Sequence, residues 1–587
     1  MRDVIVAGAG GGGAVITKEL AAQGLDVLLL EAGPRFGNLE RDWSHFESDA
    51  NGLFGGYFRF GPADLSRPAW LRELPQSSLF LQLSGVGGTT NHYQGNSPRA
   101  MPGAFAAYEG DDAAAYDTAH LFPFSYRELI PYYEWVEHTL PVQTAPMGAK
   151  EDAFLRGAQL LGLPVQRSKD ITRAACRAQE NAIIQPSGTA GKTNDPSKLQ
   201  FPQAKGCTFC GHCAQGCFLP RHAPLNLKSK RATSVSYMPM ALTADLWSRA
   251  GRAVTLVTDA FAVRVNTDSQ SIARSLTWRI GATGELFTED AAVIVLACGT
   301  AESPRLWLNS GLPNPNGWVG AGLTDHFVDL VVGVMPFYTG LTKGSGSGAR
   351  IDYPGYGMIE VVGQPPGTTA GLSAFSDAGI AGFYNNGLPE ARGADTVGRL
   401  VGRDLKTAMS NVDKLLYIDV FTDDDVEAQN RVTLSSNIPP DEHGQVPRIE
   451  IHYRNRSART IRNREYLVAQ AVRLLRALGA TRVHRINKPP FVIHSHSTMR
   501  MGAAPADSVL DANAESRWVR RLFIADNSAL ANGLGGPNPT LTTQALATRT
   551  AEKIFQTYFD GSPWVANSNA VSSVDHSVTE AVIRRGL

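Results

Sequence analysis

The chain has 587 residues, and its 55 Lys and Arg residues balance 55 Asp and Glu residues, which gives a formal net charge of zero at pH 7. This balance gives no reason to expect nucleic acid as a partner, because proteins that bind phosphate backbones usually carry a basic excess or stripe. With 43% hydrophobic and 19% charged residues, the composition excludes a disordered or fibrous protein. No run approaches the roughly 18 apolar residues that cross a bilayer, so we expect a large soluble protein without a transmembrane segment.

The N-terminus begins directly with a predicted strand. Residues 3–8 (DVIVAG) form a short apolar run, which leaves no room for the charged region, apolar core and cleavage site of a signal peptide. Four of the six cysteines crowd into one loop, whereas a disulfide framework would spread pairs along the chain. Both observations predict a cytoplasmic protein, which would reach the periplasm only if an exported partner carried it.

The first strand opens a dinucleotide-binding pattern. Residues 16–24 have the apolar spacing of a helix, and residues 26–33 (DVLLLEAG) read as a second strand, which completes a βαβ unit. The turn before the helix matches G-x-G-x-x-G, a pattern that permits a tight turn and brings the backbone and a helix N-terminus close to a pyrophosphate. The three glycines of this pattern are Gly8, Gly10 and Gly13.

Two other residues of this unit bear on the ligand. Glu31 lies near the end of the second strand, where an acid binds a ribose hydroxyl. Because a carboxylate there disfavours a 2′-phosphate, the pattern predicts FAD or NAD rather than NADP. We interpret Gly12, beside the pattern, as redundant flexibility without a role of its own.

The rest of the chain alternates helical and strand-like segments without an internal repeat. Residues 35–80 read as irregular cover, and the polar stretch around 186–198 reads as an exposed loop. Residues 331–485 alternate apolar and polar stretches, which predicts a second domain that contains a sheet. Further helices are predicted at 125–140, 304–311, 464–480 and 542–559, the last of the chain, and further strands at 253–265, 275–281, 291–300 and 521–526.

Five segments carry a family resemblance: GVGGTTNHYQGN (85–96), GTAESPRLWLNSGL (299–312), VGAGLTDHF (319–327), HSHSTMRMG (494–502) and NPTLTTQALATRTAE (538–552). In this order they resemble the glucose–methanol–choline (GMC) oxidoreductases over nearly the whole chain. The resemblance implies FAD rather than NAD, and an α/β fold with a discontinuous Rossmann-like FAD-binding domain and a second domain whose antiparallel sheet shapes the substrate site. The FAD-binding domain would comprise 1–110, 201–330 and 486–587, and the lid and substrate-binding domain 111–200 and 331–485.

The resemblance also implies two catalytic residues. HSHSTMRMG is similar to the family's H-x-x-G-T-x-x-M-G, which places the catalytic histidine at His494 and puts Ser497 where the family has glycine. His496 competes, because residues two apart on an extended chain point to the same face. Asn538 aligns with the family's second catalytic position. Alcohol oxidation needs a base that titrates near neutrality, such as imidazole, a hydride acceptor, which is flavin N5, and a group such as an amide that holds the substrate oxygen.

The same resemblance indicates which residues hold the flavin. Gly87, Gly88 and Thr89 match the loop beside the flavin. His92 falls where a subset of relatives joins a histidine covalently to the 8α carbon, and a histidine that packs near the ring without a covalent link is an equally good reading, so the sequence leaves both open. Four further positions are expected to contact FAD: Ala262, Asp526, Pro539 and Thr540.

The remaining motif is GCTFCGHCAQGCFLP (206–220). Its C-x₂-C-x₂-C-x₃-C spacing matches the bacterial ferredoxin run, with Phe218 in place of the usual proline. Zinc usually takes two ligand pairs separated by a dozen or more residues, and a redox C-x-x-C pair would leave two cysteines unexplained. The compact loop therefore favours an iron–sulfur cluster, with metal ligands among Cys207, Cys210, Cys213 and Cys217.

A subgroup of the family that includes the catalytic subunit of bacterial FAD-dependent glucose dehydrogenase looks alike at this loop, and the resemblance implies a 3Fe–4S cluster. The register then favours Cys207, Cys213 and Cys217 as ligands. If Cys210 also binds, the cluster would be 4Fe–4S, and the sequence leaves this choice open.

Together the two cofactors predict an FAD-dependent dehydrogenase that oxidises a primary or secondary alcohol, including a sugar, to a carbonyl compound. Electrons would leave singly through the cluster to an external acceptor such as a cytochrome or quinone, and relatives of the glucose type also work with a small accessory subunit. One alternative is an oxygen-using GMC oxidase with a structural cluster. Another is a flavin disulfide reductase, although its C-x-x-C pair normally follows the first dinucleotide motif closely rather than about 200 residues later. No motif in 331–485 identifies the substrate.

Overall fold

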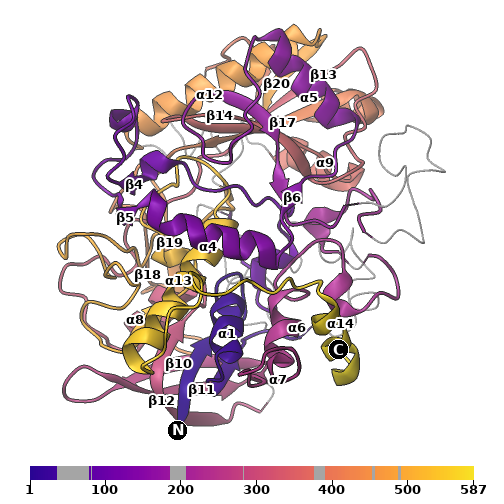
Figure 1. Cartoon of the computed structure of the whole chain (residues 1–587). Coiled ribbons are helices and arrows are strands. Elements are labelled where there is room, and N and C mark those ends of the chain that lie inside the picture. Colours follow the sequence, from indigo (N-terminus) through magenta and orange to yellow (C-terminus); the bar gives the residue numbers. More distant parts are fainter. Residues whose placement is uncertain are drawn as a thin grey trace.

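Two seven-stranded sheets form the frame of the molecule. In Figure 1 the sheet that contains β1 (Arg2–Ala7) lies near the N-terminus at the bottom, and the sheet that contains β13 (Asp329–Val334) lies at the top. Helices α4 (Tyr126–Thr139) and α13 (Thr540–Tyr558) pack against each other in the region between them (Figure 1). The structure is a computed structural model that describes residues 1–35, 79–80, 82–185, 206–217, 219–281, 283–375, 390–398, 400–452, 456–486 and 491–587.

The first sheet is the dinucleotide-type sheet expected from the N-terminal sequence. In spatial order it contains β10 (Ala260–Thr267), β11 (Ala273–Ile280), β12 (Leu286–Leu296), β1, β2 (Val27–Leu30) and β9 (Thr255–Val257), with β22 (Leu522–Ile524) beside β12. Strand β1 runs parallel to both β12 and β2, and α1 (Gly13–Ala22) connects β1 to β2. The central strands are continuous apolar runs because they are buried on both faces.

One predicted strand of this sheet is interrupted. The run at 253–265 predicts a single strand, but the structure divides it into β9 and β10. Asp259 separates them with a φ of 52°, a left-handed conformation that aspartate tolerates better than most residues. Asp259 N also donates a hydrogen bond to Gly33 O at 3.1 Å, which ties the break to the end of β2.

The second sheet is mostly antiparallel, as the family resemblance implies. Its spatial order is β16 (Thr396–Val397), β20 (Arg482–Ile486), β13, β17 (Leu415–Thr422), β15 (Gly357–Val362), β14 (Ser347–Tyr353) and β7 (Ala175–Ala178). Side chains alternate between its faces: Ile418 and Val420 pack into an apolar core with helix α12 (Ala458–Ala477), whereas Asp419 and Phe421 face a cavity on the other side. The fold class is confirmed, and the domain boundaries stay a prediction.

The remaining helices surround these sheets and include one that the sequence pattern missed. The helix expected at 542–559 is α13, but it is not the last, because α14 follows it near the C-terminus (Figure 1). Asp575 caps α14 by accepting a hydrogen bond from Ser577 N. The other helices are α5 (Ala149–Leu160), α6 (Tyr237–Leu242), α7 (Ala244–Trp247), α8 (Glu302–Asn309), α9 (Pro366–Phe375), α11 (Gly402–Ser410) and α14 (His576–Arg585).

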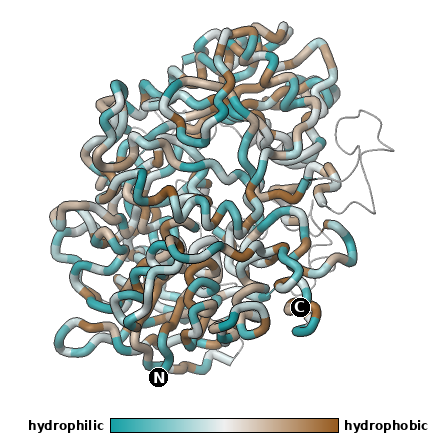
Figure 2. Tube along the Cα trace, viewed as in Figure 1, coloured by the Kyte–Doolittle hydropathy of each residue, from teal (hydrophilic) through white to brown (hydrophobic). Residues whose placement is uncertain are grey.

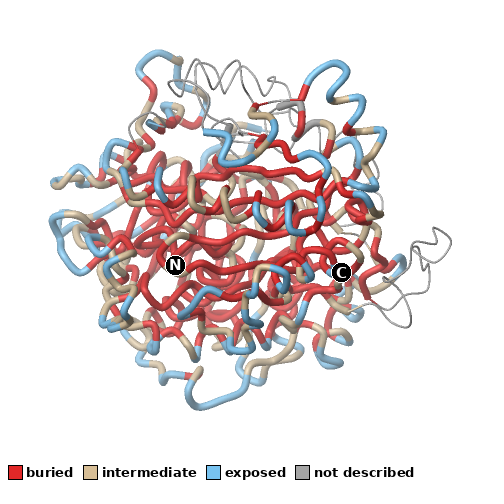
Figure 3. Tube along the Cα trace, turned by 90° about the horizontal axis from the view of Figure 1, so that it is seen from above, coloured by how far each residue is buried: buried red, intermediate tan, exposed pale blue. Residues whose placement is uncertain are grey.

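Short two-stranded sheets complete the fold, and burial follows the two large sheets. Figure 3 shows buried strands at the centre with exposed loops around them, and Figure 2 shows apolar stretches running through the interior. No helix of the described ranges is long and apolar enough to cross a membrane. The irregular cover expected at 35–80 lies almost entirely, and the loop expected around 186–198 lies entirely, outside the described residues. The short pairs are β3 (Leu79–Phe80) with β21 (Phe491–Val492), β4 (Phe105–Ala106) with β5 (Phe122–Ser125), β6 (Gln143–Thr144) with β8 (Glu180–Asn181), and β18 (Arg431–Leu434) with β19 (Pro447–Glu450).

Gly12 has a packing role, so its interpretation as redundant flexibility is wrong. A Cβ at Gly12 would lie 1.6 Å from Ala525 O, a backbone atom just after β22, and backbone cannot move aside as a flexible side chain can. Gly10 differs, since the nearest heavy atom to a Cβ there is 3.8 Å away. The turn after β1 therefore needs glycine at position 12 so that the C-terminal strand can close over it.

These two glycines provide a matched test. Gly12→Ala should lower the free energy of unfolding by roughly 3 kcal/mol or more, or prevent folding, because a buried backbone clash forces the sheet apart. Gly10→Ala should change the stability of the FAD-free protein by less than about 1 kcal/mol. Soluble yield and thermal denaturation of both variants decide the matter, and equal stability would contradict the packing role.

Candidate active site

A cavity of about 330 Å³ lies where the two sheets face each other. It is lined by the turn after β1, the 3₁₀ segment Gly88–Asn91, strands β15 and β17, and the start of α13. Of the predicted cofactor and catalytic residues, Gly13 and Gly87 are outside the lining. The cavity brings together the others: Gly8, Gly10, Glu31, Gly88, Thr89, His92, Ala262, His494, Asp526, Asn538, Pro539 and Thr540.

Glu31 ties three backbone segments together at this cavity. Its Oε2 accepts a hydrogen bond from Ala9 N at 2.8 Å, and its Oε1 accepts from Gly33 N and Gly85 N, both at 2.9 Å. Burial raises the pKa of Glu31, and these N–H donors act against that rise. The carboxylate that the sequence assigns to a ribose hydroxyl therefore also holds the walls of the site in place.

The residues around the turn fit FAD. A Cβ at Gly10 would meet only Gly88, at 3.8 Å, so the bare backbone faces open space at the N-terminus of α1. Asp526 fixes a facing wall, because its Oδ2 accepts hydrogen bonds from Gly299 N at 2.9 Å and Ser303 Oγ at 2.6 Å. A helix N-terminus, an uncovered glycine backbone and a buried carboxylate are the groups that bind the pyrophosphate and ribose of a dinucleotide.

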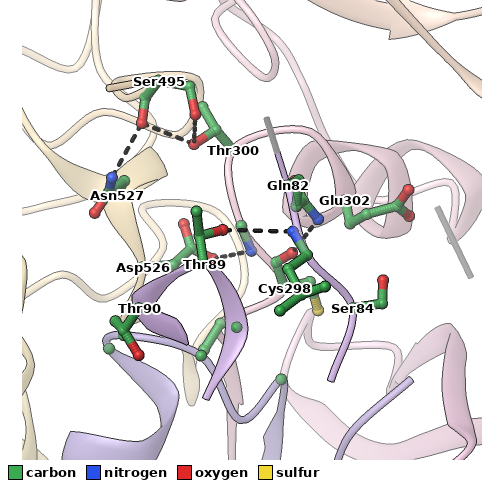
Figure 4. Close-up of a pocket in the computed structure, with 18 of the residues that line it drawn as sticks. Gln82, Ser84, Thr89, Thr90, Cys298, Thr300, Glu302, Ser495, Asp526 and Asn527 are labelled. Carbon is green, nitrogen blue, oxygen red and sulfur yellow. Dashed lines mark hydrogen bonds between the residues drawn. The ribbon is translucent and has the colours of Figure 1, made fainter. Parts of the chain in front are cut away.

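Figure 4 shows wall residues that the sequence reasoning missed. Thr300, Ser495 and Asn527 meet at one point, where Thr300 Oγ1 and Asn527 Nδ2 each donate a hydrogen bond to Ser495 O at 3.1 Å. Gln82 lies opposite and donates through Nε2 to Cys298 O at 3.1 Å (Figure 4). Two of these residues adjoin motif positions, since Thr300 follows Gly299 and Ser495 follows His494, and that adjacency was the available signal.

His494 lies beside Asn538 at the cavity wall. Asn538 Nδ2 and His494 Nε2 are 3.2 Å apart, and His494 N donates to Asp325 Oδ1 at 3.0 Å. The competing His496 is buried and is not among the described residues that line the cavity, and burial lowers its pKa well below the usual range. The geometry therefore favours His494 as the residue that meets a substrate.

His326, which the sequence analysis did not single out, fixes the tautomer of His494. His326 Nε2 lies 3.0 Å from Gly533 O, and since a carbonyl only accepts, Nε2 carries the proton. Burial lowers the pKa of His326 to about 4, so the ring is neutral and its Nδ1 accepts. That Nδ1 is 2.9 Å from His494 Nδ1, which must donate. In neutral His494 the basic nitrogen is then Nε2, the one that faces Asn538.

Ser497, at the position where the family has glycine, adopts a backbone conformation that glycine reaches without strain. Its φ of 72° is in the left-handed region, which costs a non-glycine residue on the order of 1 kcal/mol. Ser497 N donates to Asn527 O at 3.1 Å, which helps to hold the loop against the first domain. The departure from the family pattern therefore has a modest cost in stability.

The four-cysteine loop lies against the same cavity. Ala214, between Cys213 and Cys217, lines the cavity, and its carbonyl oxygen is 2.9 Å from His92 Nδ1. Burial lowers the pKa of His92 to about 3. The loop that carries the cysteines is thus in contact with a residue expected to touch the flavin.

Lys230 connects this loop to the flavin-side segment. Its fully buried ammonium donates to Asn91 O at 2.7 Å, Tyr93 O at 2.8 Å and Cys213 O at 2.5 Å. Burial lowers the pKa of Lys230 to about 8, and the neighbouring cysteines, as thiolates, would favour its charged form. A buried cation here suits an anionic group on the loop.

The thiols of the loop are the ligand type that an iron–sulfur cluster requires, but they are not arranged as a preformed binding site. Burial and the neighbouring thiols raise the pKa of Cys210 to about 12, so metal binding would have to displace protons. In the described parts of the chain, which include all four cysteines, no three Cys, His, Asp or Glu side chains converge closely enough to hold a metal ion. Cluster assembly would therefore have to draw the loop together.

The chain resembles known flavoenzymes in sequence and structure. Two family models described as GMC oxidoreductase match residues 201–328 and 426–547. The chain is 28% identical to paromamine 6′-oxidase of Streptomyces fradiae, over 94% of this chain and 91% of that protein, and 25% identical to 2-methyl-1,2-propanediol dehydrogenase of Mycolicibacterium austroafricanum, over 95% and 96%. Pyridoxine 4-oxidase from Mesorbium loti shares the fold with a TM-score of 0.58 at 15% identity, over 96% of this chain and 100% of that chain.

The family models and these curated relatives define an FAD-dependent oxidoreductase that acts on alcohols or sugars. The chain belongs to the GMC oxidoreductase family, so the family resemblance of the sequence is confirmed. These relatives include oxidases and dehydrogenases alike.

Replacing His326 tests its control of the His494 tautomer. His326→Phe keeps a buried ring but removes the acceptor for His494 Nδ1–H, and a proton on Nε2 would block the base. Anaerobic flavin reduction by a saturating alcohol should slow by about 10- to 100-fold, as when an outer hydrogen-bond partner of a histidine is lost. His326→Asn, whose amide oxygen can accept, should recover part of the rate. Identical limiting rates for the wild type and His326→Phe would contradict the assignment.

Proposed function

We propose that this protein is an FAD-dependent dehydrogenase that oxidises a primary or secondary alcohol, sugars included, and releases electrons through an iron–sulfur cluster to an external acceptor. The observation that carries the proposal is the contact between two sites. The His494–Asn538 pair and the FAD cradle share one cavity, and the four-cysteine loop forms part of its wall at Ala214.

The chain's own residues account for proton removal and substrate placement. His494 takes the hydroxyl proton at Nε2, the nitrogen that the His326 contact leaves basic. Asn538 donates from Nδ2 to the substrate oxygen, which holds the C–H bond in place. Bound FAD supplies the hydride acceptor. Asn538 comes just before α13, whose N-cap is Pro539, so its amide does not cap that helix, and it lies beside His494 Nε2.

The cysteine loop supports an electron exit by its position and charge. The loop reaches the cavity at Ala214, whose carbonyl oxygen contacts His92, and Lys230 ties Cys213 to the segment beside the flavin. The ferredoxin-like spacing supplies enough thiolates for a 3Fe–4S or 4Fe–4S cluster. A cluster bound there accepts electrons one at a time.

A second candidate is an oxygen-using oxidase in which the iron–sulfur cluster is structural. The relationship to paromamine 6′-oxidase over nearly the whole chain favours it. The relationships to 2-methyl-1,2-propanediol dehydrogenase and to the fructose dehydrogenase large subunit favour the dehydrogenase.

His494→Ala tests the assigned base. Without it, the rate constant for anaerobic flavin reduction by an alcohol should fall by at least about 100-fold, the usual contribution of a general base. His496→Gln serves as the matched control, because that residue is buried next to the site without lining it. If His494→Ala reduced the flavin at the normal rate and His496→Gln did not, the base would be His496 rather than His494.

Iron and acid-labile sulfide analysis tests the electron exit. Protein purified anaerobically should contain roughly three or four iron atoms per FAD, and Cys207→Ser and Cys217→Ser should lose them. Cys176→Ser is the control, since Cys176 is buried in β7, outside the loop. In an anaerobic titration the alcohol should reduce the flavin first and then bleach the cluster. A cluster that keeps one redox state while oxygen reoxidises the flavin at the full rate would instead favour the oxidase.

A further inference from the structure

Gln179 is a buried amide that lies between the second sheet and the catalytic pair. It directly follows β7, is fully buried, and is not among the described residues that line the cavity, so its side chain does not meet a substrate. Its backbone is fixed on both sides, because Gln179 N donates to Gly348 O at 2.9 Å and Gln179 O accepts from Ala145 N at 2.8 Å. The side chain therefore starts from a fixed point beside the sheet.

Arg350 determines which way the Gln179 amide faces. Arg350 Nη1 donates to Gln179 Oε1 at 3.1 Å, and because a guanidinium can only donate, this end of the amide must be the oxygen. Arg350 is itself fully buried and is held by Asp352, whose carboxylate lies 3.1 Å from Arg350 Nε. The Gln179 Nε2 group therefore points away from Arg350 and toward the site.

The two N–H bonds of Gln179 Nε2 have two acceptors. Gln179 Nε2 donates to Glu360 Oε2 at 3.1 Å and, over a longer distance of 3.5 Å, to Asn538 Oδ1. Because Gln179 presents N–H groups at this point, the Asn538 atom that faces it must be the oxygen. Asn538 Nδ2 is then directed at His494 Nε2, which is 3.2 Å away.

This orientation of Asn538 agrees with the one that His326 requires. The His326 contact leaves His494 Nε2 without a proton, and an unprotonated ring nitrogen accepts an N–H of Asn538 but cannot bind its oxygen. One hydrogen-bond chain starts at Arg350 in β14, and the other starts at Gly533. The two chains therefore meet at the contact between His494 and Asn538 with the same polarity.

The chain through Gln179 keeps this polarity during the reaction, whereas the chain through His326 does not. When His494 takes the hydroxyl proton at Nε2, that atom becomes a donor and no longer favours an N–H of Asn538. The Gln179 amide does not titrate, so it continues to bind Asn538 Oδ1. The N–H of Asn538 is most valuable at this moment, because the substrate oxygen carries negative charge once its proton has left.

We propose that Gln179 is a positioning residue for the oxidation, which holds the Asn538 amide with its Nδ2 toward the substrate oxygen. This inference rests on the proposed function, in which Asn538 donates to that oxygen. Gln179 acts only through Asn538, so its contribution to the rate is that of one hydrogen bond, about 10-fold.

Gln179→Met tests this role, since methionine keeps the length of the side chain without its N–H groups. The holoenzyme is reduced anaerobically with glucose, 1,3-propanediol or benzyl alcohol, whichever reduces the wild-type flavin fastest. The limiting rate should fall by about 10-fold. The alcohol concentration for half-saturation should change by less than about 2-fold, because the lost interaction belongs to the transition state. An unchanged limiting rate would overturn the inference.

Asn226→Leu is the matched control for the loss of a buried amide. Asn226 is also fully buried, donates to Ser573 O at 3.0 Å and Thr579 Oγ1 at 2.8 Å, and is not among the described residues that line the cavity. Its replacement should lower the melting temperature and leave the limiting rate of flavin reduction unchanged. A loss of rate equal to that of Gln179→Met would overturn the inference.

A double-mutant cycle separates positioning from structural damage. In an Asn538→Ala background, Gln179→Met should cause no further loss of rate, because no amide is left to orient. Gln179→Glu, which keeps an oxygen for Arg350, is a second variant and should show the same dependence on Asn538. An equal loss in both backgrounds would overturn the inference and leave the proposed function intact. A normal rate in Asn538→Ala alone, or failure of all three alcohols to reduce the wild-type flavin, would overturn both.

Discussion

The site depends on one short hydrogen-bond chain that runs from Gly533 O through His326 to His494. A backbone carbonyl can only accept, so it dictates the proton position on His326, and His326 in turn dictates the proton position on His494. The chain joins the C-terminal segment to the loop before β13, which are far apart in sequence. The packing of the two sheets thus determines the protonation of His494 Nε2, because only their correct docking places the Nδ1 atoms of the two imidazoles 2.9 Å apart.

The second domain contributes to the same cavity by alternation along its strands. In β15 and β17 alternate side chains enter the apolar core under α12, and three of the residues between them, Glu360, Asp419 and Phe421, line the cavity. The core side is apolar and supplies stability. The cavity side can carry carboxylates and amides without weakening that core, so the substrate surface and the stabilising surface of one sheet are separated by the pleat.

The local features of the site could be predicted from the sequence, whereas contacts made across the fold could not. Gly10, Glu31, His494 and Asn538 lie in contiguous motifs, and the structure places all four at the cavity. Gly12 was misread because the atom that excludes a side chain there belongs to Ala525, more than five hundred positions away. Strand register, which pairs Glu360 with Asp419, is likewise a tertiary property without a sequence motif.

Glu31 has a consequence for cofactor exchange. Both of its carboxylate oxygens are occupied by backbone N–H groups from three separate segments, so the cradle is organised by the protein before any nucleotide arrives, and less ordering entropy opposes binding. The same arrangement also limits how the cofactor specificity of the site can change. Replacing Glu31 to accommodate a phosphorylated ribose would also remove its hydrogen bonds to Ala9, Gly33 and Gly85. Such a change would therefore disturb the walls of the site as well as the ribose contact.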